Sequence, residues 1–245
     1  MVDSPKTGTL FVVATPIGNM EDLTPRAARV LGEVELIAAE DTRTTGRLLQ
    51  RIGLRKPMLS LFRQNTARRV EELLALLRAG KSVAVVSESG TPVVSDPGVE
   101  VVKAAHEAGF PVRTIPGPSA VTAALSASGF PADHFTFAGF LPRKRGKRQT
   151  LLRKLAATES TVVLYESPYR LVETLQDILE VFGDVEIALC REMTKLYEEI
   201  RRGPVSAIIA RFAAMTVRGE IVIVIGGTKS AGTTTAVPTT SGAHR

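Results

Sequence analysis

Short runs of aliphatic residues alternate along this chain with longer segments whose apolar residues recur every three or four positions. A short apolar run between turn residues is typical of a buried strand, and the longer spacing is typical of a helix with one apolar face. The alternation predicts an α/β protein in which helices cover sheets. The expected strands are residues 10–14, 36–39, 58–61, 83–86, 112–115, 135–140, 162–165, 186–189 and 221–225.

Two of the expected helices have readable ends. Ser167 is the expected N-cap of the first, with Pro168 at its first helical position and Gly183 after its last turn. The second is expected from about residue 66 to residue 79, with Gly80 as its stop. Each presents one apolar face, so we assign both to the core and give them no chemistry.

The chain is expected to form two domains. Turn-forming residues at 129–133 interrupt the pattern and suggest a boundary. We therefore expect a flexible N-terminus at residues 1–7, an N-terminal α/β domain at 8–128, a C-terminal α/β domain at 134–227 and a disordered tail at 228–245, because the tail is rich in Thr, Gly and Ser without hydrophobic periodicity.

The composition excludes several classes of protein. With 245 residues, 44% hydrophobic and 23% charged, the chain has the make-up of an ordinary globular protein. No apolar stretch approaches the roughly 18 residues of a membrane span, and residues 1–9 lack the apolar core of a signal peptide. A single cysteine and three scattered histidines argue against disulfides and against a metal site. We expect a cytoplasmic protein without membrane or metal.

The positive charge is concentrated in one segment. The net charge is +6, but residues 143–154 hold seven cations and no acid, so the other residues together carry −1. The seven are Arg143, Lys144, Arg145, Lys147, Arg148, Arg153 and Lys154. Such a strip is either a docking site for a polyanion or a solvated loop and helix start. By itself it does not distinguish RNA from DNA.

Three turns rich in Gly, Pro and Ser follow expected strands directly, at residues 15–19, 87–98 and 116–120. In open α/β sheets, ligands bind beyond the carboxyl ends of the strands, where such turns meet. Each turn alone is explained by simple turn chemistry, but three at successive strand ends favour a ligand site. The glycine-rich signature of dinucleotide-binding proteins does not follow the first expected strand. Gly80-Lys81-Ser82 resembles the end of the NTPase phosphate-binding loop, but it precedes a strand and does not open a helix.

These turns carry a specific resemblance. The string VATPIGNMEDLTPRA at residues 13–27 resembles the opening of the ribosomal RNA small subunit methyltransferase I family, which belongs to the tetrapyrrole methylase superfamily. The resemblance continues, in the family's order, through residues 39–43, 90–98, 116–120, 139–142, 165–168, 191–195 and 219–222. It implies two α/β domains of the tetrapyrrole methylase type, with S-adenosyl-L-methionine in a cleft between them, and a homodimer.

The resemblance also implies a substrate and a set of cofactor contacts. Members of the family that the chain resembles methylate the ribose 2′-hydroxyl of a cytidine in the decoding region of 16S rRNA within the small ribosomal subunit. The cofactor contacts that it implies are Pro16, Ser89, Gly90, Thr91, Val94, Ser119, Ala120, Glu166 and Met193. This chain has Ser87-Glu88-Ser89-Gly90 where the family usually reads Ser-Asp-Ala-Gly.

Methyl transfer to a ribose hydroxyl benefits from a base that takes the hydroxyl proton. Glu40 and then Asp41 are the candidate bases, because they follow the second expected strand at the same sheet edge as the turns. The alternatives are that Asp41 caps the next helix, or that positioning alone suffices. Arg43 and Lys195 are candidate RNA phosphate or ribose contacts, with surface ion pairs as the alternative. Tyr165 either packs in the fold or stacks on a base or on the adenine; packing is favoured.

Two other functions remain open. The first is methylation of a small tetrapyrrole or corrin intermediate, which would not need seven clustered cations. The second is a non-catalytic RNA-binding assembly factor, which would be expected to have degraded cofactor loops. The basic strip is explained by RNA binding. The residues expected to bind RNA, in the strip and outside it, are Arg43, Arg143, Lys144, Arg145, Lys147, Arg148 and Lys195.

Overall fold

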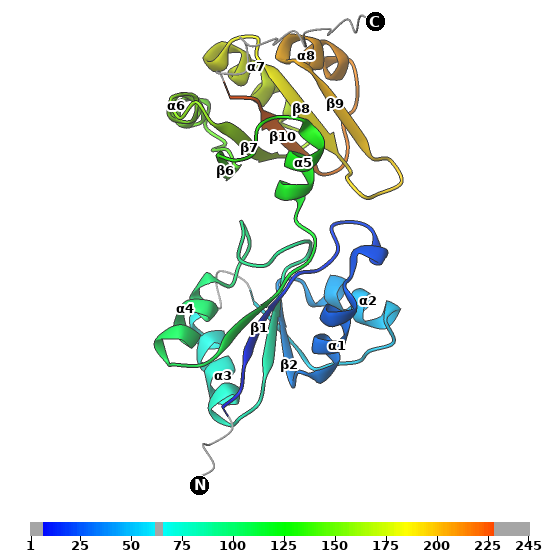
Figure 1. The fold of residues 1–245 in the computed structure, drawn as a ribbon, viewed down its shortest axis with the longest axis vertical. Helices are drawn as coiled ribbons and strands as arrows, with labels where there is room; N and C mark the ends of the chain where they lie inside the picture. Colours follow the sequence, from blue (N-terminus) through cyan, green and yellow to red (C-terminus); the bar gives the residue numbers. More distant parts are fainter. Residues whose placement is uncertain (1–6, 62–65, 228–245) are drawn as a thin grey trace, which may run out of the picture. The chain divides into compact units, whose positions relative to one another are not determined.

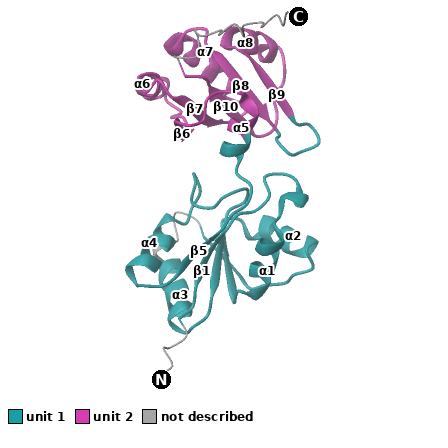
Figure 2. Ribbon diagram, in the orientation of Figure 1, with its two compact units in different colours: residues 1–123, 192–198 teal, residues 124–191, 199–245 magenta. Residues whose placement is uncertain are grey.

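A computed structural model describes residues 7–61 and 66–227. The chain divides into two compact units, shown in Figure 2: unit 1 comprises residues 1–123 and 192–198, and unit 2 comprises 124–191 and 199–245. The division falls inside helix α5 (Ala120–Ser128), a few residues before the turn-rich segment 129–133. The tail expected at 228–245 lies outside the described residues, as do 1–6 of the expected N-terminus.

Unit 1 contains a five-stranded parallel sheet in the order β3-β2-β4-β1-β5. Its strands are β1 (Leu10–Val13), β2 (Leu36–Ala39), β3 (Met58–Ser60), β4 (Val83–Val86) and β5 (Val112–Ile115). Its helices are α1 (Pro25–Glu33), α2 (Thr42–Arg51), α3 (Thr66–Arg78), α4 (Val99–Glu107) and the first part of α5. The short 3-10 helix η1 (Met20–Asp22) precedes α1.

Helices cover both faces of this sheet, with α1 and α2 on one side and α3 and α4 on the other (Figure 1). Strand β4 shows why: Ala84 and Val86 pack with the first helix pair, whereas Val83 and Val85 pack with the second. A strand buried on both faces reads as a continuous apolar run, here VAVV. The expected stop of the helix at 66–79 is nearly right, since α3 ends at Arg78 and Gly80 takes φ +75°.

Unit 2 contains a mixed five-stranded sheet in the order β6-β7-β10-β8-β9, in which the neighbours β6 and β7 pair in parallel and the other neighbouring strands pair antiparallel. Its strands are β6 (Phe135–Phe140), β7 (Thr161–Glu166), β8 (Glu186–Arg191), β9 (Glu199–Pro204) and β10 (Ile221–Ile225). Its helices are α6 (Arg145–Ala156), α7 (Leu171–Phe182) and α8 (Val205–Ala213). Ile221, Ile223 and Ile225 of the central strand pack with these three helices in one core.

The start of α7 differs from the sequence prediction. The helix begins at Leu171 with Arg170 as its N-cap, and residues 167–170 form a turn closed by Arg170 N–H donating to the Ser167 carbonyl (3.0 Å). No side chain that the structure describes caps the start of this helix, so Ser167 does not serve as the cap, and its backbone N–H donates to the Glu166 carboxylate (2.7 Å). The predicted end is confirmed, because Gly183 follows the last helical residue with φ +76°.

Strand β9 was missing from the prediction because its residues are polar. It is an edge strand that pairs with β8 alone, so it needs no buried face. The carboxylate of Glu199, its first residue, forms ion pairs with three guanidinium groups, at N–O distances of 3.1 Å from Arg191, 2.9 Å from Arg201 and 2.7 Å from Arg211. Hydrogen bonds from these arginines, Arg201 foremost, lower the pKa of Glu199 to about 2. Charge pairing therefore anchors this edge where apolar burial does not.

Candidate active site

The three predicted ligand turns meet at one edge of the unit 1 sheet. Thr15 and Gly90 pair through both backbone groups, with N–H to carbonyl distances of 2.9 and 3.1 Å. The Thr91 hydroxyl donates to the Pro118 carbonyl (3.2 Å), which joins the turn after β4 to the turn after β5. Because all five strands are parallel, their carboxyl ends lie at the same edge, and these bonds lock the turns together there.

The turn after β4 has an unusual backbone. Gly90 takes φ +79°, and a Cβ there would lie 3.2 Å from Ile17 Cγ2. Val93 and Ser95 take φ +75° and +67°. Residues other than glycine rarely adopt positive φ, and a β-branched residue such as Val93 least of all. Strain of this kind costs on the order of 1–3 kcal/mol per residue and gathers at ligand sites. The surrounding hydrogen bonds therefore hold this turn in a shape that local preferences disfavour.

Unit 1 brings most of the implied cofactor residues together. Seven of them lie on the joined turns: Pro16, Ser89, Gly90, Thr91, Val94, Ser119 and Ala120. Met193 lies in the segment 192–198, which also belongs to unit 1. The neighbouring Thr194 and Lys195 pack closely against the first turn. A Cβ on Gly18 would lie 2.8 Å from the Thr194 hydroxyl oxygen.

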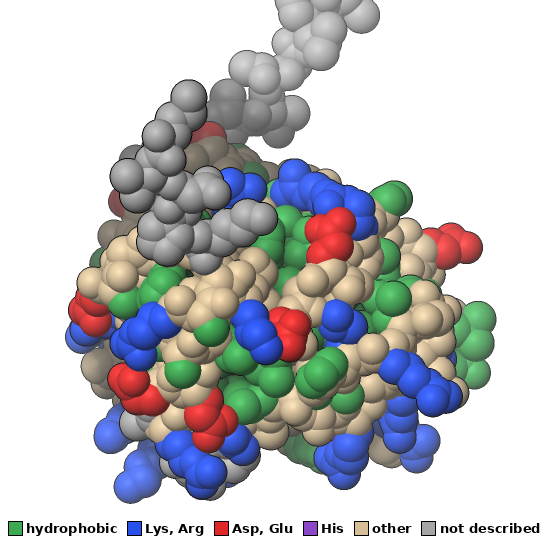
Figure 3. Space-filling model, turned by 90° about the horizontal axis from the view of Figure 1, so that it is seen from below, with side chains coloured by type: hydrophobic (Ala, Val, Ile, Leu, Met, Phe, Trp, Pro, Cys, Tyr) green, Lys and Arg blue, Asp and Glu red, His purple; other side chains and the backbone are tan. Residues whose placement is uncertain are grey.

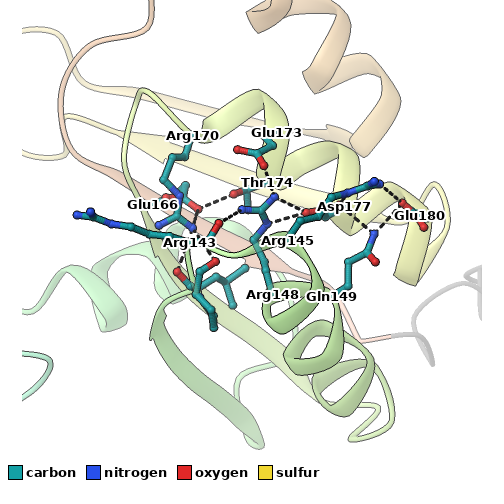
Figure 4. Close-up of polar contacts among 12 residues, drawn as sticks. Arg143, Arg145, Arg148, Gln149, Glu166, Arg170, Glu173, Thr174, Asp177 and Glu180 are labelled. Atoms are coloured by element: carbon teal, nitrogen blue, oxygen red, sulfur yellow. Dashed lines mark hydrogen bonds and ion pairs between the residues drawn. The ribbon is translucent and has the colours of Figure 1, made fainter.

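Glu166 lies in unit 2, and its carboxylate is already occupied there (Figure 4). The side chain is buried, accepts from the Thr174 hydroxyl (2.6 Å) and from Ser167 N–H (2.7 Å), and lies 3.4 Å from the Arg170 guanidinium. These contacts fix the turn before α7. Any part that Glu166 plays toward a cofactor would come from its backbone or from the turn that it holds.

The two candidate bases differ in their surroundings. Asp41 is the N-cap of α2: its carboxylate accepts from Arg43 N–H (2.7 Å) and pairs with the Arg43 guanidinium (3.1 Å). These hydrogen bonds from Arg43 lower the pKa of Asp41, which makes it a weaker base. Capping, the alternative reading of Asp41, is what the structure shows. Glu40 instead accepts from the backbone N–H of Glu88 (3.4 Å), beside the strained turn.

Asp96 is a functional candidate that sequence reasoning missed. It lies in the same turn and is half-buried, and burial together with the negative charges of Glu40 and Glu88 raises its pKa to about 6, against a weaker opposing hydrogen bond with Ser87. A carboxyl poised near neutrality in a ligand turn is typical of a functional site. The motif Ser95-Asp96-Pro97-Gly98 was visible in the sequence, but the proximity of Glu40 was not.

Arg43 and Lys195, predicted to contact RNA, both form local ion pairs. Arg43 pairs with Asp41, and Lys195 Nζ lies 2.9 Å from a Glu192 carboxylate oxygen. Arg43 remains exposed, whereas the Lys195 side chain is largely covered. Both arrangements match the surface-pair alternative, and a role in RNA binding stays a prediction for both.

Comparison with known proteins identifies the family. Residues 9–209 match the model of the Tetrapyrrole (Corrin/Porphyrin) Methylases. The chain is 49% identical, over 90% of its own length and 99% of the relative's, to the ribosomal RNA small subunit methyltransferase I of Thermotoga maritima. The chain belongs to the tetrapyrrole methylase family and, within it, to the ribosomal RNA small subunit methyltransferase I group. The predicted family and fold class are thereby confirmed.

Solved structures agree on the fold. The chain resembles uroporphyrin-III-C-methyltransferase from Thermus thermophilus with a TM-score of 0.61 and 26% identity, covering 89% of this chain and 94% of that one. A second structure of uroporphyrin-III C-methyltransferase from Thermus thermophilus, complexed with S-adenosyl homocysteine, matches with a TM-score of 0.62 and 21% identity, covering 89% and 97% of the two chains. The likeness extends over both units.

The basic strip of this tetrapyrrole methylase divides into two sets of side chains. The buried Arg148 donates to Asp177 and to Glu173, each at 2.6 Å, and Arg145 donates to Asp177 at 3.0 Å and Glu180 at 2.7 Å (Figure 4). Burial raises the pKa of Asp177, but hydrogen bonds from the two arginines outweigh it and leave that pKa below its ordinary value. Arg148 was predicted to contact RNA; its burial against α7 makes it a structural arginine.

The other set faces solvent. Arg143, Lys144, Lys147, Arg153 and Lys154 are exposed, and none forms an ion pair with another residue that the structure describes. Lys147 and Lys154 line a hollow of about 280 Å³ on the outer side of α6. On the face drawn in Figure 3, by contrast, Lys and Arg side chains lie among Asp, Glu and hydrophobic ones. The surface that can attract a polyanion is therefore made of five cations.

Among the described residues of this methylase, no helix is both long and apolar enough to cross a membrane.

Proposed function

We propose that this protein transfers the methyl group of S-adenosyl-L-methionine to a ribose 2′-hydroxyl of 16S rRNA in the small ribosomal subunit, and that the acceptor is a cytidine of the decoding region. The observation that carries the proposal is the set of joined, strained turns at the carboxyl edge of unit 1, with a carboxyl of raised pKa among them. The ribosomal substrate is supported by the name of the relative that is 49% identical.

The residues of unit 1 fit such a cofactor. The Thr194 hydroxyl is buried without a hydrogen-bond partner among the described residues, beside the first turn. Val94 is exposed within the strained turn, where it can cover an apolar part of a ligand. When bound, the cofactor supplies an activated methyl group on a sulfonium. Pro16, Gly90, Thr91 and the residues of the turn after β5 would hold it by backbone contacts and shape.

The remaining task of the protein is to orient the hydroxyl and to receive its proton. Asp96 suits proton acceptance, because a base is most effective when its pKa lies near the working pH. Burial raises the pKa of Asp96 and the negative charge of Glu40 raises it further, so we assign proton acceptance to Asp96 and tuning to Glu40. Asp41 orients the start of α2 through its cap. This assignment revises the sequence prediction, which favoured Glu40 and then Asp41.

The five exposed cations in and just before α6 supply the interaction with rRNA. Each Lys or Arg that neutralises a phosphate adds affinity that falls with salt. We further propose that the protein works in the cytoplasm, where small subunits assemble, and as a homodimer. Replacing Arg143, Lys144 and Lys147 by Ala should weaken subunit binding and flatten its salt dependence, while cofactor affinity stays unchanged.

The deciding experiment incubates the purified full chain with methyl-labelled S-adenosylmethionine and small subunits from cells that lack this enzyme. Nuclease digestion and mass spectrometry then locate the label. A single 2′-O-methylcytidine in 16S rRNA supports the proposal. Label on a base, or no label despite cofactor binding, contradicts it.

The second candidate is methylation of a tetrapyrrole, favoured by the likeness to uroporphyrin-III-C-methyltransferase at 26% identity. Transfer of label to a carbon of uroporphyrin III, measured in the same assay, would support this alternative. The five exposed cations argue for the nucleic acid, because a small molecule needs fewer charges.

A further inference from the structure

An aromatic cluster lies at the carboxyl end of the parallel strand pair in unit 2, outside the turns described above. The rings of Phe137 and Phe140 lie 4.9 and 5.5 Å from the ring of Tyr165, both in tilted, edge-type arrangements. Phe140 is 59% exposed, although phenylalanine side chains are usually buried in folded proteins. The cluster therefore offers an aromatic ring to solvent on a base of packed rings.

A β-bulge creates this cluster. Residues three apart in a strand point to opposite faces, so Phe137 and Phe140 would normally face away from each other. Strand β6 carries one extra residue opposite β7: Phe137 pairs with Val163 and Phe140 pairs with Tyr165, which places both rings on one face. Bulges often re-aim a side chain beside a functional site. The exposed ring thus results from a specific backbone irregularity.

Cations follow the exposed ring directly. Arg143 and Lys144 come three and four residues after Phe140, are exposed, and precede α6. The Arg170 guanidinium donates to the carbonyls of Leu141 (3.0 Å) and Pro142 (3.4 Å), so the link between ring and cations is held in place. Arg148 also donates to the Arg143 carbonyl (3.3 Å). Arg148 and Arg170, both drawn in Figure 4, thereby hold the backbone that leads from Phe140 to the cations.

We propose that Phe140, supported by Tyr165, stacks on an unpaired base of the RNA substrate while Arg143 and Lys144 neutralise the neighbouring phosphates. The inference rests on the proposed rRNA substrate and specifies the RNA element that unit 2 binds. Proteins recognise single-stranded RNA by stacking bases on aromatic side chains, whereas bases in a duplex are already stacked on each other. A ring next to two cations is complementary to one nucleotide and its phosphates.

The test uses the full chain and a fluorescein-labelled RNA of about a dozen nucleotides, single-stranded or annealed to its complement. Phe140→Ala should weaken single-strand binding roughly 5- to 100-fold, the effect of losing one stacked base. The slope of log affinity against log salt should stay unchanged in this variant. Arg143→Ala with Lys144→Ala should instead lower that slope by about 1.4, because each phosphate contact on a single strand contributes about 0.7.

Phe135→Ala is the matched control. Phe135 lies at the other end of the same strand and is 42% exposed, so it tests for a general effect of losing an exposed Phe. It should bind RNA as the wild type does. Because the chain contains no Trp, Phe140→Trp also installs a unique fluorophore. Its emission should be quenched by the single-stranded RNA and not by the duplex.

The inference is overturned if Phe140→Ala binds the single strand with wild-type affinity, or if saturating RNA leaves the Phe140→Trp emission unchanged. It is also overturned if Phe140→Ala dissociates a dimer in sedimentation without loss of RNA affinity, because the ring is then a subunit contact. Methyl transfer by the wild type to small subunits is measured in parallel. Absent transfer defeats the proposed function, whereas transfer with an indifferent Phe140 defeats only the stacking.

Discussion

Replacing Asp96 by Asn should stabilise the protein above pH 6. The folded state holds this carboxyl half-buried near Glu40 and Glu88, which raises its pKa from 3.8 to about 6. A carboxyl with a raised folded pKa favours folding at low pH, and this contribution is lost as the pH rises through 6. The rise corresponds to about 3 kcal/mol at about 1.4 kcal/mol per pKa unit, and solvent screening of a half-exposed group reduces it to about 1–2 kcal/mol.

Thermal unfolding of Asp96→Asn and wild type should be compared between pH 4 and pH 8. At 1–2 kcal/mol, the variant should melt roughly 3–8 °C higher at pH 8, and the difference should shrink toward zero near pH 4. Asp184→Asn is a control, because the pKa of Asp184 is lowered by its hydrogen bonds from Ser206 and not raised. Equal melting temperatures at pH 8, or a difference that grows on acidification, would refute the reasoning.

The same residue should control the pH dependence of methyl transfer. If Asp96 accepts the proton, wild-type kcat/KM falls about tenfold per pH unit below 6 and levels off above it. Asp96→Asn should lose roughly 100- to 10,000-fold in rate while it still binds the cofactor. Glu40→Gln should retain activity and shift the acid limb to lower pH, because it removes a charge that raises the pKa of Asp96. Loss of activity in Glu40→Gln without such a shift would instead make Glu40 the base.

Three further changes test the framework. Arg148→Ala leaves the buried Asp177 underpaired and should cost about 3–5 kcal/mol in urea unfolding, whereas Arg145→Ala should cost much less because the Arg145 side chain is exposed; equal costs would contradict the burial argument. Glu199→Gln should lower the melting temperature above pH 4.5, with the difference vanishing as the pH falls toward 2; a pH-independent difference would argue against the three arginines as its cause. Gly90→Ala should cost about 1–2 kcal/mol and weaken cofactor binding, measured by calorimetry, because the position takes φ +79°; unchanged affinity would place the cofactor away from this turn.

The sequence was sufficient to predict the edge of unit 1 where the turns meet. Parallel strands bring their carboxyl ends to one side, so turns at 15–19, 87–98 and 116–120 had to meet once the strands were recognised. The side-chain chemistry there was not predictable to the same degree. Burial raises the pKa of Asp96, and so does the negative charge of Glu40, which is far from it in sequence. Periodicity and spacing carry no information about such a pair.

The basic strip shows the same limit and its physical cause. The seven cations in residues 143–154 look equivalent in the sequence, because a count of charges does not say which way each side chain points. Once residues 145–156 form α6, helical spacing turns Arg145 and Arg148 toward the acids of α7 and leaves the lysines outside. The two arginines then hold α6 against α7, and Arg148 also donates to the Arg143 carbonyl in the segment that follows Phe140. Removing Arg148 should therefore weaken RNA binding without flattening its salt slope, which distinguishes a cation that positions the surface from one that touches phosphate.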